Sequence, residues 1–201
     1  MKSDQLPKSS TEPVEARRKA LRADAQRNRD AVVRAAIEMF QKHGIETPLE
    51  DVAKAAKVGI ATLYRHFPSR EALLAAALER KDLDLLDTAA EVRMMDNPKL
   101  ALGVWLIALQ EYLTTFGGLQ STILYAVDEP KSPLAITCDC ILSITNDLLL
   151  AAQMQGAVRK DVSPKQLFQC ALGLSWAFKE TRSDEQTRSG VLRILESGYL
   201  A

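Results

Sequence analysis

The sequence is poor in cysteine, and its few cysteines are not arranged for a disulfide framework or a metal site. Its 201 residues include three cysteines, an odd number, at Cys138, Cys140 and Cys170. Cys138 and Cys140 are two residues apart, so on a helix they point in different directions, and neither His43 nor His66 supplies an obvious further ligand. We therefore expect buried, reduced, structural thiols, and neither a metal nor a cofactor.

Long hydrophobic segments are also absent. The first eleven residues are polar and contain no apolar core of a signal peptide. The longest apolar runs, such as residues 100–109, have about ten residues. That length suits a buried helix and is too short to cross a bilayer. We expect a cytoplasmic protein with no membrane partner.

The chain has no net charge, but its charge is unevenly distributed. It contains 26 Lys and Arg against 26 Asp and Glu. Residues 1–70 hold 14 basic and 9 acidic residues, whereas residues 71–201 hold 12 and 17. This asymmetry indicates either a polyanionic partner for the first part or a solvated basic face. We recognise no nucleophile–base pair, phosphate-binding glycine loop or metal-ligand spacing, so we expect no catalytic residues.

Helical periodicity runs along most of the chain and predicts an all-α fold. Apolar residues recur at 3.6-residue spacing from Asp24 onward, and no alternating run requires a strand. Residues 1–23 are polar and are expected to form a disordered basic arm. A first domain is expected over residues 24–70 and a second over residues 71–201. In the second domain the predicted helices cover residues 70–95 (as one helix or two), 98–117, 119–127, 134–155, 164–179 and 185–199.

Two short helices follow each other in the stretch LEDVAKAAKVGIATLYRHF, residues 49–67. Thr47 is predicted to be the N-cap of the first helix, with Pro48 at the first helical position and Glu50 completing a capping box. A break of three residues then precedes the second helix, residues 60–66. Two helices joined by such a turn, after a third packed helix, form a helix-turn-helix module. Helical spacing alone also fits a plain helical hairpin.

The second short helix has the composition of a helix that reads DNA. Apolar Val58, Leu63 and Phe67 are predicted to hold it on its scaffold, and small residues at its start permit close approach to a major groove. Polar side-chain tips then reach phosphates or base edges, and helix starts can hold phosphates. The candidate DNA-binding residues are Thr47, Lys57, Ile60, Ala61, Thr62, Tyr64, His66 and Arg70.

The run FQKHGIETPLEDVAKAAKVGIATLYRHFPSREALLAAAL resembles the DNA-binding domain of the TetR family of bacterial transcriptional regulators. The resemblance covers about the first 80 residues, and TLYRHFPSREAL, residues 62–73, is its most specific part. It implies a recognition helix at residues 60–66, with Ile60 and Ala61 nearest the bases. Thr62 and Tyr64 would contact bases or backbone, and Thr47, His66 and Arg70 would contact phosphates.

The chain departs from the family pattern in three places. Lys57 stands where a glycine usually makes the turn, which costs about 1 kcal/mol in a left-handed conformation but adds a phosphate contact. Gly59 replaces the usual Ser or Thr cap. Ile60 and Ala61 offer no hydrogen bonds to bases, so apolar contacts and shape readout gain weight. The arm with Arg17, Arg18, Lys19 and Arg22 either adds phosphate or minor-groove contacts or forms a solvated tail.

The second domain of such proteins binds a small molecule and forms the dimer. The predicted helices 98–117 and 134–155 are apolar enough to surround a cavity, although each apolar residue also fits ordinary core packing. The candidate ligand-binding residues are Met94, Trp105, Leu109, Tyr112, Phe116, Ser143, Asn146 and Asp147. The last two helices carry surplus apolar surface for a homodimer. The candidate interface residues are Phe168, Leu172, Trp176, Val191 and Leu195.

These features lead to one main hypothesis and one alternative. The main hypothesis is a homodimeric, ligand-responsive transcriptional regulator, expected to be a repressor, that binds a pseudo-palindromic double-stranded operator. The alternative is an all-helical small-molecule-binding protein that has lost DNA binding, for which Lys57, Gly59 and Ala61 leave room. The effector, the operator and the regulated genes are not encoded in any recognisable motif.

Overall fold

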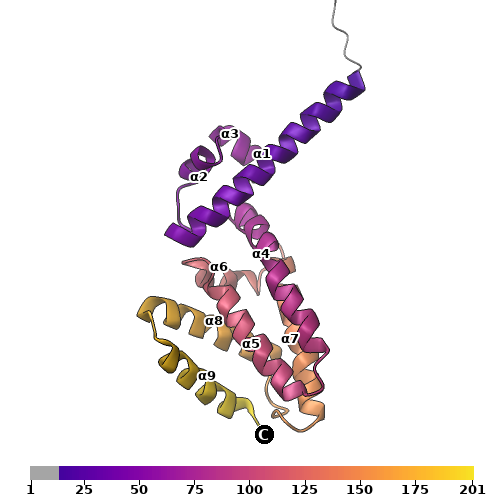
Figure 1. Ribbon diagram of the computed structural model, residues 1–201, viewed down its shortest axis with the longest axis vertical. Helices are drawn as coiled ribbons and strands as arrows, with labels where there is room; N and C mark the ends of the chain where they lie inside the picture. Colours follow the sequence, from indigo (N-terminus) through magenta and orange to yellow (C-terminus); the bar gives the residue numbers. More distant parts are fainter. Residues whose placement is uncertain (1–13) are drawn as a thin grey trace, which may run out of the picture.

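The computed structural model describes residues 14–201, and this range is helical, with no strand beyond a single bridge between Val158 and Leu200. The predicted all-α fold is therefore confirmed. Figure 1 shows the helices in two groups, with α1, α2 and α3 at one end of the elongated molecule and α5 to α9 at the other. The helices are α1 (Val14–His43), α2 (Leu49–Ala55), α3 (Ile60–His66), α4 (Arg70–Arg93), α5 (Pro98–Thr114), α6 (Leu119–Ala126), α7 (Ala135–Met154), α8 (Pro164–Thr181) and α9 (Glu185–Tyr199).

The first helix begins ten residues earlier than the sequence pattern predicted. The expectation of a disordered arm was wrong for residues 14–23, which form the first turns of α1; the rest of that arm lies outside the described residues. The prediction relied on apolar periodicity, which residues 14–23 do not have. They are instead rich in Ala, Arg, Lys and Glu, which favour helix without any packed face.

Four of the other helices, α4, α5, α8 and α9, begin at a side-chain cap. Ser69 Oγ accepts a hydrogen bond from the N–H of Ala72, and Asn97 Oδ1 accepts one from Leu100. Thr47, however, forms no capping box: Pro48 is the N-cap of α2, and the Thr47 hydroxyl donates backward to the carbonyl of Gly44 at 2.8 Å. A capping box occurs instead at α8, between Ser163 and Gln166.

The two groups of helices share α4 and meet beside it. Phe40 of α1 and Phe116, just after α5, form an edge-to-face pair with ring centroids 5.9 Å apart. The N–H of Ile45 donates to the carbonyl of Gly117 at 2.8 Å. Gly44 packs so closely there that a Cβ on it would lie 3.0 Å from the Gly117 oxygen. The loop after α1 is thus docked, largely by main-chain atoms, on the turn between α5 and α6.

Two expectations about α7 and the cysteines need correction. Among the described residues, α7 is long and apolar enough to cross a membrane, and α5 with α6 would pass the same test only as one bent span. The apolar side of α7 is nevertheless buried in the helical core, with Ile144 and Leu148 among the buried residues. Only Cys138 is a buried thiol, and burial raises its pKa to about 11. Cys140 and Cys170 are exposed, since they lie on the outer faces of α7 and α8.

Candidate nucleic-acid interface and effector pocket

The predicted recognition helix, α3, is fixed by a small set of buried side chains. Leu63 is 0% exposed and Phe67 3%, and they pack against the core that contains Val52 and Phe40, both 0% exposed. Val58, in the turn before α3, is half-buried against the same core. The predicted anchoring of this helix is confirmed. Since α3 has only seven residues, its position depends on these contacts rather than on its own hydrogen bonds.

The opposite side of α3 faces solvent and carries the predicted DNA-binding residues. Ile60, Ala61 and Tyr64 are exposed, and Thr62 and His66 are half-buried. Sequence reasoning missed Arg65. Its side chain folds back along α3, so that Nε donates to the carbonyl of Ala61 and Nη2 donates to Thr62 Oγ1 at 3.0 Å. The three-residue spacing of Thr62 and Arg65 could have shown this contact.

The turn between α2 and α3 has the geometry predicted from the two residues, Lys57 and Gly59, that differ there from the family pattern. Lys57 adopts a left-handed conformation, with φ of 57°, and its side chain is exposed. Gly59 is the N-cap of α3 and provides no side-chain hydrogen bond. The start of α3 therefore leaves its first backbone N–H groups without a side-chain cap.

Thr47 and Arg70 lie at the joint between α1, α2 and α4 rather than on the outer face. Thr47 is 6% exposed, with its hydroxyl turned inward. Arg70 Nη1 donates to the carbonyls of Ile45 and Thr47, at 2.5 Å and 2.6 Å. These two residues fasten the loop after α1 to the start of α4. We therefore reassign Thr47 from a phosphate contact to this structural role.

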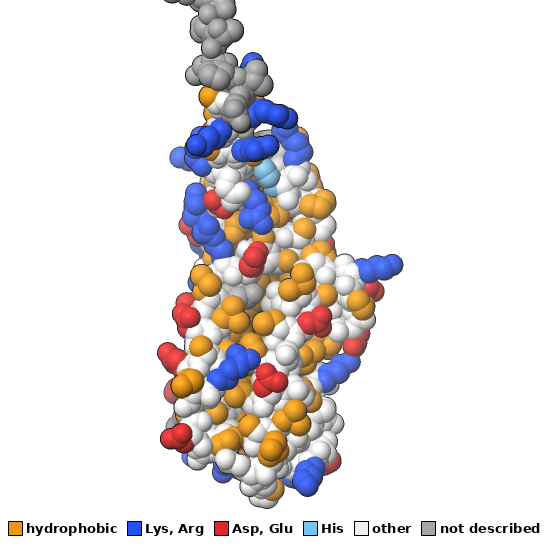
Figure 2. All heavy atoms as spheres, turned by 90° about the vertical axis from the view of Figure 1, so that its right-hand side faces the viewer, with side chains coloured by type: hydrophobic (Ala, Val, Ile, Leu, Met, Phe, Trp, Pro, Cys, Tyr) orange, Lys and Arg blue, Asp and Glu red, His pale blue; other side chains and the backbone are white. Residues whose placement is uncertain are grey.

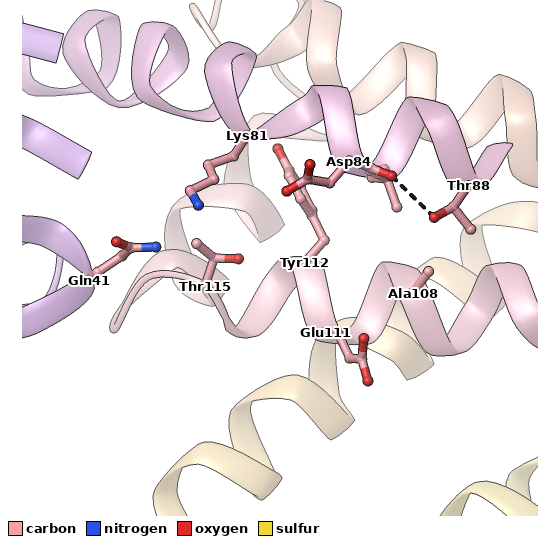
Figure 3. Close-up of a pocket in the computed structure, with 9 residues that line it drawn as sticks. Gln41, Lys81, Asp84, Thr88, Ala108, Glu111, Tyr112 and Thr115 are labelled. Carbon is pink, nitrogen blue, oxygen red and sulfur yellow. Dashed lines mark hydrogen bonds between the residues drawn. The ribbon is translucent and has the colours of Figure 1, made fainter. Parts of the chain in front are cut away.

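A polar pocket of about 320 Å³ lies where the two groups of helices meet. Figure 3 shows Lys81 of α4 extending toward Gln41 of α1 and Thr115, which follows α5. Asp84 and Thr88 continue the α4 wall, and the Thr88 hydroxyl donates to the Asp84 carbonyl at 3.1 Å. The remaining lining residues are Leu85, Ala108, Glu111 and Tyr112. Both signs of charge are present, which suits a polar ligand.

Of the predicted ligand-binding residues, Tyr112 lines this pocket. Trp105, Leu109 and Phe116 are each 0% exposed and belong to the core, where Trp105 Nε1 donates to Thr145 Oγ1 at 2.9 Å. The polar candidates on α7 do not converge with them on a common cavity. Ser143 and Asp147 face outward, as does Met94, and Asp147 pairs with Arg93 at 3.6 Å. Beside its apolar neighbours in the sequence, Asp147 was compatible with either a partnered buried site or an exposed edge, and the structure places it at an exposed edge.

The predicted dimer residues are divided between the core and the surface. Phe168 and Leu172 are 1% and 4% exposed and pack inside their own subunit, because α8 buries this face against α5 and α7. Trp176 is 58% exposed on the outer face of α8, and Ile194 is 73% exposed on α9. Val191 and Leu195 are half-buried. Outward apolar surface thus remains on both helices.

Helix α9 stands apart from the rest of its group in Figure 1. It is tied at its ends. The Arg188 guanidinium donates to the Ser183 carbonyl and lies over the Phe178 ring, and the N–H of Arg159 donates to the Tyr199 carbonyl at 3.1 Å. Burial raises the pKa of Tyr199 to about 12. Between these ends, a groove of about 430 Å³ separates α9 from α5.

Comparison with known proteins agrees with this architecture. The family described as bacterial regulatory proteins, tetR family, matches residues 32–77, and the family described as transcriptional regulator SbtR-like, C-terminal domain, matches residues 97–200. A solved TetR transcriptional regulator from Streptomyces coelicolor is 28% identical, covers 86% of this chain and 98% of its own, and superposes with a TM-score of 0.57. A solved TetR transcription regulatory protein from Mycobacterium vanbaalenii is 30% identical, covers 90% of this chain and 99% of its own, and superposes with a TM-score of 0.53.

A curated relative matches over a shorter range. An HTH-type transcriptional regulator of Staphylococcus aureus is 35% identical over 69 residues, which is 34% of this chain and 37% of that regulator. The chain thus matches little more than a third of that relative's length.

An exposed, polar recognition helix on a buried anchor, followed by a larger helical domain, defines a helix-turn-helix DNA-binding regulator. The chain belongs to the TetR family of bacterial transcriptional regulators.

Proposed function

We propose that the protein is a homodimeric, ligand-responsive repressor that binds a pseudo-palindromic operator in the cytoplasm. The observation that carries this proposal is the division of α3 into a buried and an exposed side. Leu63 and Phe67 fix the helix, while Ile60, Ala61 and Tyr64 project into solvent. A short helix held in this way is suited to enter a major groove as a rigid unit.

The chemistry of the exposed side predicts how DNA is read. Ile60 and Ala61 suit contact with thymine methyl groups, and Tyr64 and Thr62 carry hydroxyls for phosphates or base edges. Because Arg65 already donates to Thr62 Oγ1, that hydroxyl is free to donate its own proton outward. Lys57, exposed in the turn, supplies a phosphate contact beside the start of α3.

The arrangement of α8 and α9 supports a dimer of this chain. Trp176 and Ile194 offer exposed apolar surface, and Gly173, on the same side of α8 as Trp176, permits close approach. Large aromatic residues on such a face commonly dominate the energy of an interface. A two-fold dimer would place two recognition helices on the two half-sites of an operator.

The pocket between α1, α4 and α5 is the effector site that the geometry supports best. Its walls contain Gln41, three residues before Gly44, and Thr115, two residues before Gly117. A ligand held between them would bear directly on the contact of Ile45 with Gly117, where the two domains meet. With Lys81 and Asp84 on the α4 wall and Glu111 on α5, the pocket suits a small polar molecule that carries charged groups of both signs.

Fluorescence anisotropy on DNA from upstream of the protein's own gene tests the main proposal. The wild type is expected to bind tightly and to weaken steeply with salt. The variant Thr62→Ala/Tyr64→Ala should bind at least about tenfold more weakly, a loss of ~1.4 kcal/mol or more. Thr122→Ala/Tyr125→Ala, which removes the same residue types from α6, should bind like the wild type.

Retention of wild-type affinity in Thr62→Ala/Tyr64→Ala would show that α3 does not read DNA. Binding of the wild type no tighter to upstream DNA than to random DNA would favour the alternative, a helical small-molecule-binding protein without an operator.

A further inference from the structure

The first half of α1 extends beyond the domain to which the helix belongs. Figure 1 shows α1 continuing past α3 to the end of the molecule. Residues 16–28 are exposed at every position, whereas Val32 and Ala36 are both 0% exposed. These thirteen exposed residues correspond to roughly three and a half turns, or ~20 Å, of helix. This half of α1 has no packing role within the described subunit.

One face of α1 changes from apolar to basic along its length. Residues 18, 22, 25, 29, 32, 36 and 40 are three or four apart and therefore lie on one side of the helix. The later positions, Val32, Ala36 and Phe40, are 0% exposed in the domain core. The earlier positions are Arg18, Arg22, Ala25 and Arg29. We name Arg18, Arg22 and Arg29 the basic stripe.

A contact at its inner end orients this stripe toward the recognition helix. The Arg29 guanidinium lies 5.3 Å from the centre of the Phe67 ring, and Phe67 directly follows α3. Arg22 and Arg18 continue from there in the direction of the chain start. A shallow pocket shows that this half of α1 and α3 lie side by side; its lining includes Asp24 and Ala25 of α1 and Thr62 and Arg65 of α3.

The basic stripe keeps a positive charge because few carboxylates lie near it. Residues 16–29 contain six Lys and Arg and a single acidic residue, Asp24, which pairs with Arg27 on a different side of the helix. In the view of Figure 2, Lys and Arg side chains gather around the end of the molecule from which α1 projects. Arg18 and Arg22 are one turn apart, ~6 Å along the axis, and a DNA strand carries a phosphate about every 3.4 Å along its axis. A polyanion with closely spaced charges fits this surface.

We propose that the basic stripe binds DNA phosphates that flank the groove read by α3, and so lengthens the site bound by each subunit. The inference rests on the proposed function, because it takes α3 as the helix that enters the major groove. Phosphate contacts of this kind fix position and add affinity on every sequence, whereas the exposed side of α3 selects the sequence. The stripe would therefore raise total affinity without changing operator preference.

The full chain carrying Arg18→Gln/Arg22→Gln tests the stripe. Arg29 is left in place because it packs on Phe67, and glutamine keeps helix propensity close to that of arginine. Lys99→Gln/Lys160→Gln removes two exposed charges from the second domain and serves as the matched control. Anisotropy over a range of salt gives the slope of log K against log salt, on the upstream duplex and on a random duplex.

The stripe variant should lose about 1.8 from this slope for each subunit bound, ~0.9 for each lost phosphate contact. The loss should be equal on both duplexes, so the ratio of operator to random affinity stays the same. Hydroxyl-radical footprints should lose protection at the outer edge of each half-site. The control should keep the wild-type slope.

Each result separates the stripe from the function of α3. A wild-type slope in Arg18→Gln/Arg22→Gln, or an equal loss in the control, overturns the stripe while leaving α3 as the recognition helix. A wild type that binds neither duplex overturns both proposals, and the stripe would then belong to another acidic partner. Loss of sequence preference with an unchanged slope would also contradict the assignment, since it would place Arg18 or Arg22 on bases.

Discussion

Lys57 combines an unfavourable backbone conformation with an exposed charge that we propose contacts DNA. Its left-handed backbone, φ 57°, disfavours a residue with a Cβ atom, and its exposed ammonium lies beside the start of the recognition helix. Glycine would relieve the backbone but would remove the charge. The departure from the usual turn glycine is therefore consistent with a phosphate contact rather than with folding.

We expect Lys57→Gly to raise the free energy of unfolding by about 1 kcal/mol, because the left-handed cost for an L-residue disappears. Lys57→Ala loses the same charge but keeps Cβ, so its stability should match the wild type. Urea denaturation measures both variants. Equal stability of the two variants would show that the turn stores no backbone strain. Both variants should bind DNA more weakly than the wild type.

Sequence reasoning identified α3 more completely than it identified the roles of single polar residues. Leu63, Phe67 and the exposed Tyr64 follow from spacing and composition alone. Thr47 did not, because Ser, Thr, Asn and Asp make local hydrogen bonds in turns as readily as at N-caps. Its hydroxyl donates to the carbonyl of Gly44, in the loop before the helix that Thr47 was predicted to cap. Which carbonyl a hydroxyl reaches depends on the loop, which no periodicity describes.

Helix boundaries were predicted well where caps exist and poorly where propensity alone decides. The starts of α3, α4, α5 and α8 coincide with recognisable signals such as Gly59, Ser69, Asn97 and Ser163. The first turns of α1 have neither periodicity nor an apolar face. The sequence also did not show which face of α8 is buried, because both faces carry apolar residues and the packing of α5 and α7 decides between them.

The outer faces of α8 and α9 predict how the proposed dimer responds to mutation. Trp176→Ala should weaken the dimer at least about thirtyfold, the effect of ~2 kcal/mol at an interface anchor. Trp176 is exposed in the subunit, so the variant should fold normally. Sedimentation equilibrium over a range of concentrations gives the dissociation constant. Tyr125→Ala, which removes an aromatic residue that is 77% exposed on α6, is the control and should leave it unchanged. An unaffected dimer in Trp176→Ala would place the interface elsewhere.

The whole molecule joins its two domains at a place that also borders the polar pocket. The Phe40–Phe116 pair, the Ile45–Gly117 hydrogen bond and the pocket residues Gln41 and Thr115 all lie at this junction. Lys179 adds a hydrogen bond to the Thr114 carbonyl at 3.0 Å, and burial lowers the pKa of its ammonium. A conformational change at this junction would be transmitted to the DNA-binding domain through the loop after α1 and through α4.

A compound that releases the operator makes this coupling measurable. Polar compounds are screened for loss of anisotropy, and an effector is expected to change the operator Kd about 5- to 150-fold. Lys81→Ala/Asp84→Ala should bind the operator normally but no longer respond. Asp96→Ala/Lys99→Ala removes the same two residue types, at the same spacing, from an exposed part of the second domain and should respond fully. A full response of Lys81→Ala/Asp84→Ala would move the effector to another site, for which the groove between α5 and α9 is the next candidate.

The close approach of Gly44 to Gly117 also bears on how such a protein can diversify. A hydrogen bond between main-chain atoms does not depend on which side chains surround it, and a Cβ atom on Gly44 or on Gly117 would lie 3.0 Å or 3.3 Å from the backbone of the other glycine. Provided both positions stay glycine, the DNA-binding domain and the second domain can accumulate substitutions independently without losing their alignment. A joint of this kind would let recombination pair an existing operator preference with a new effector response in a single step.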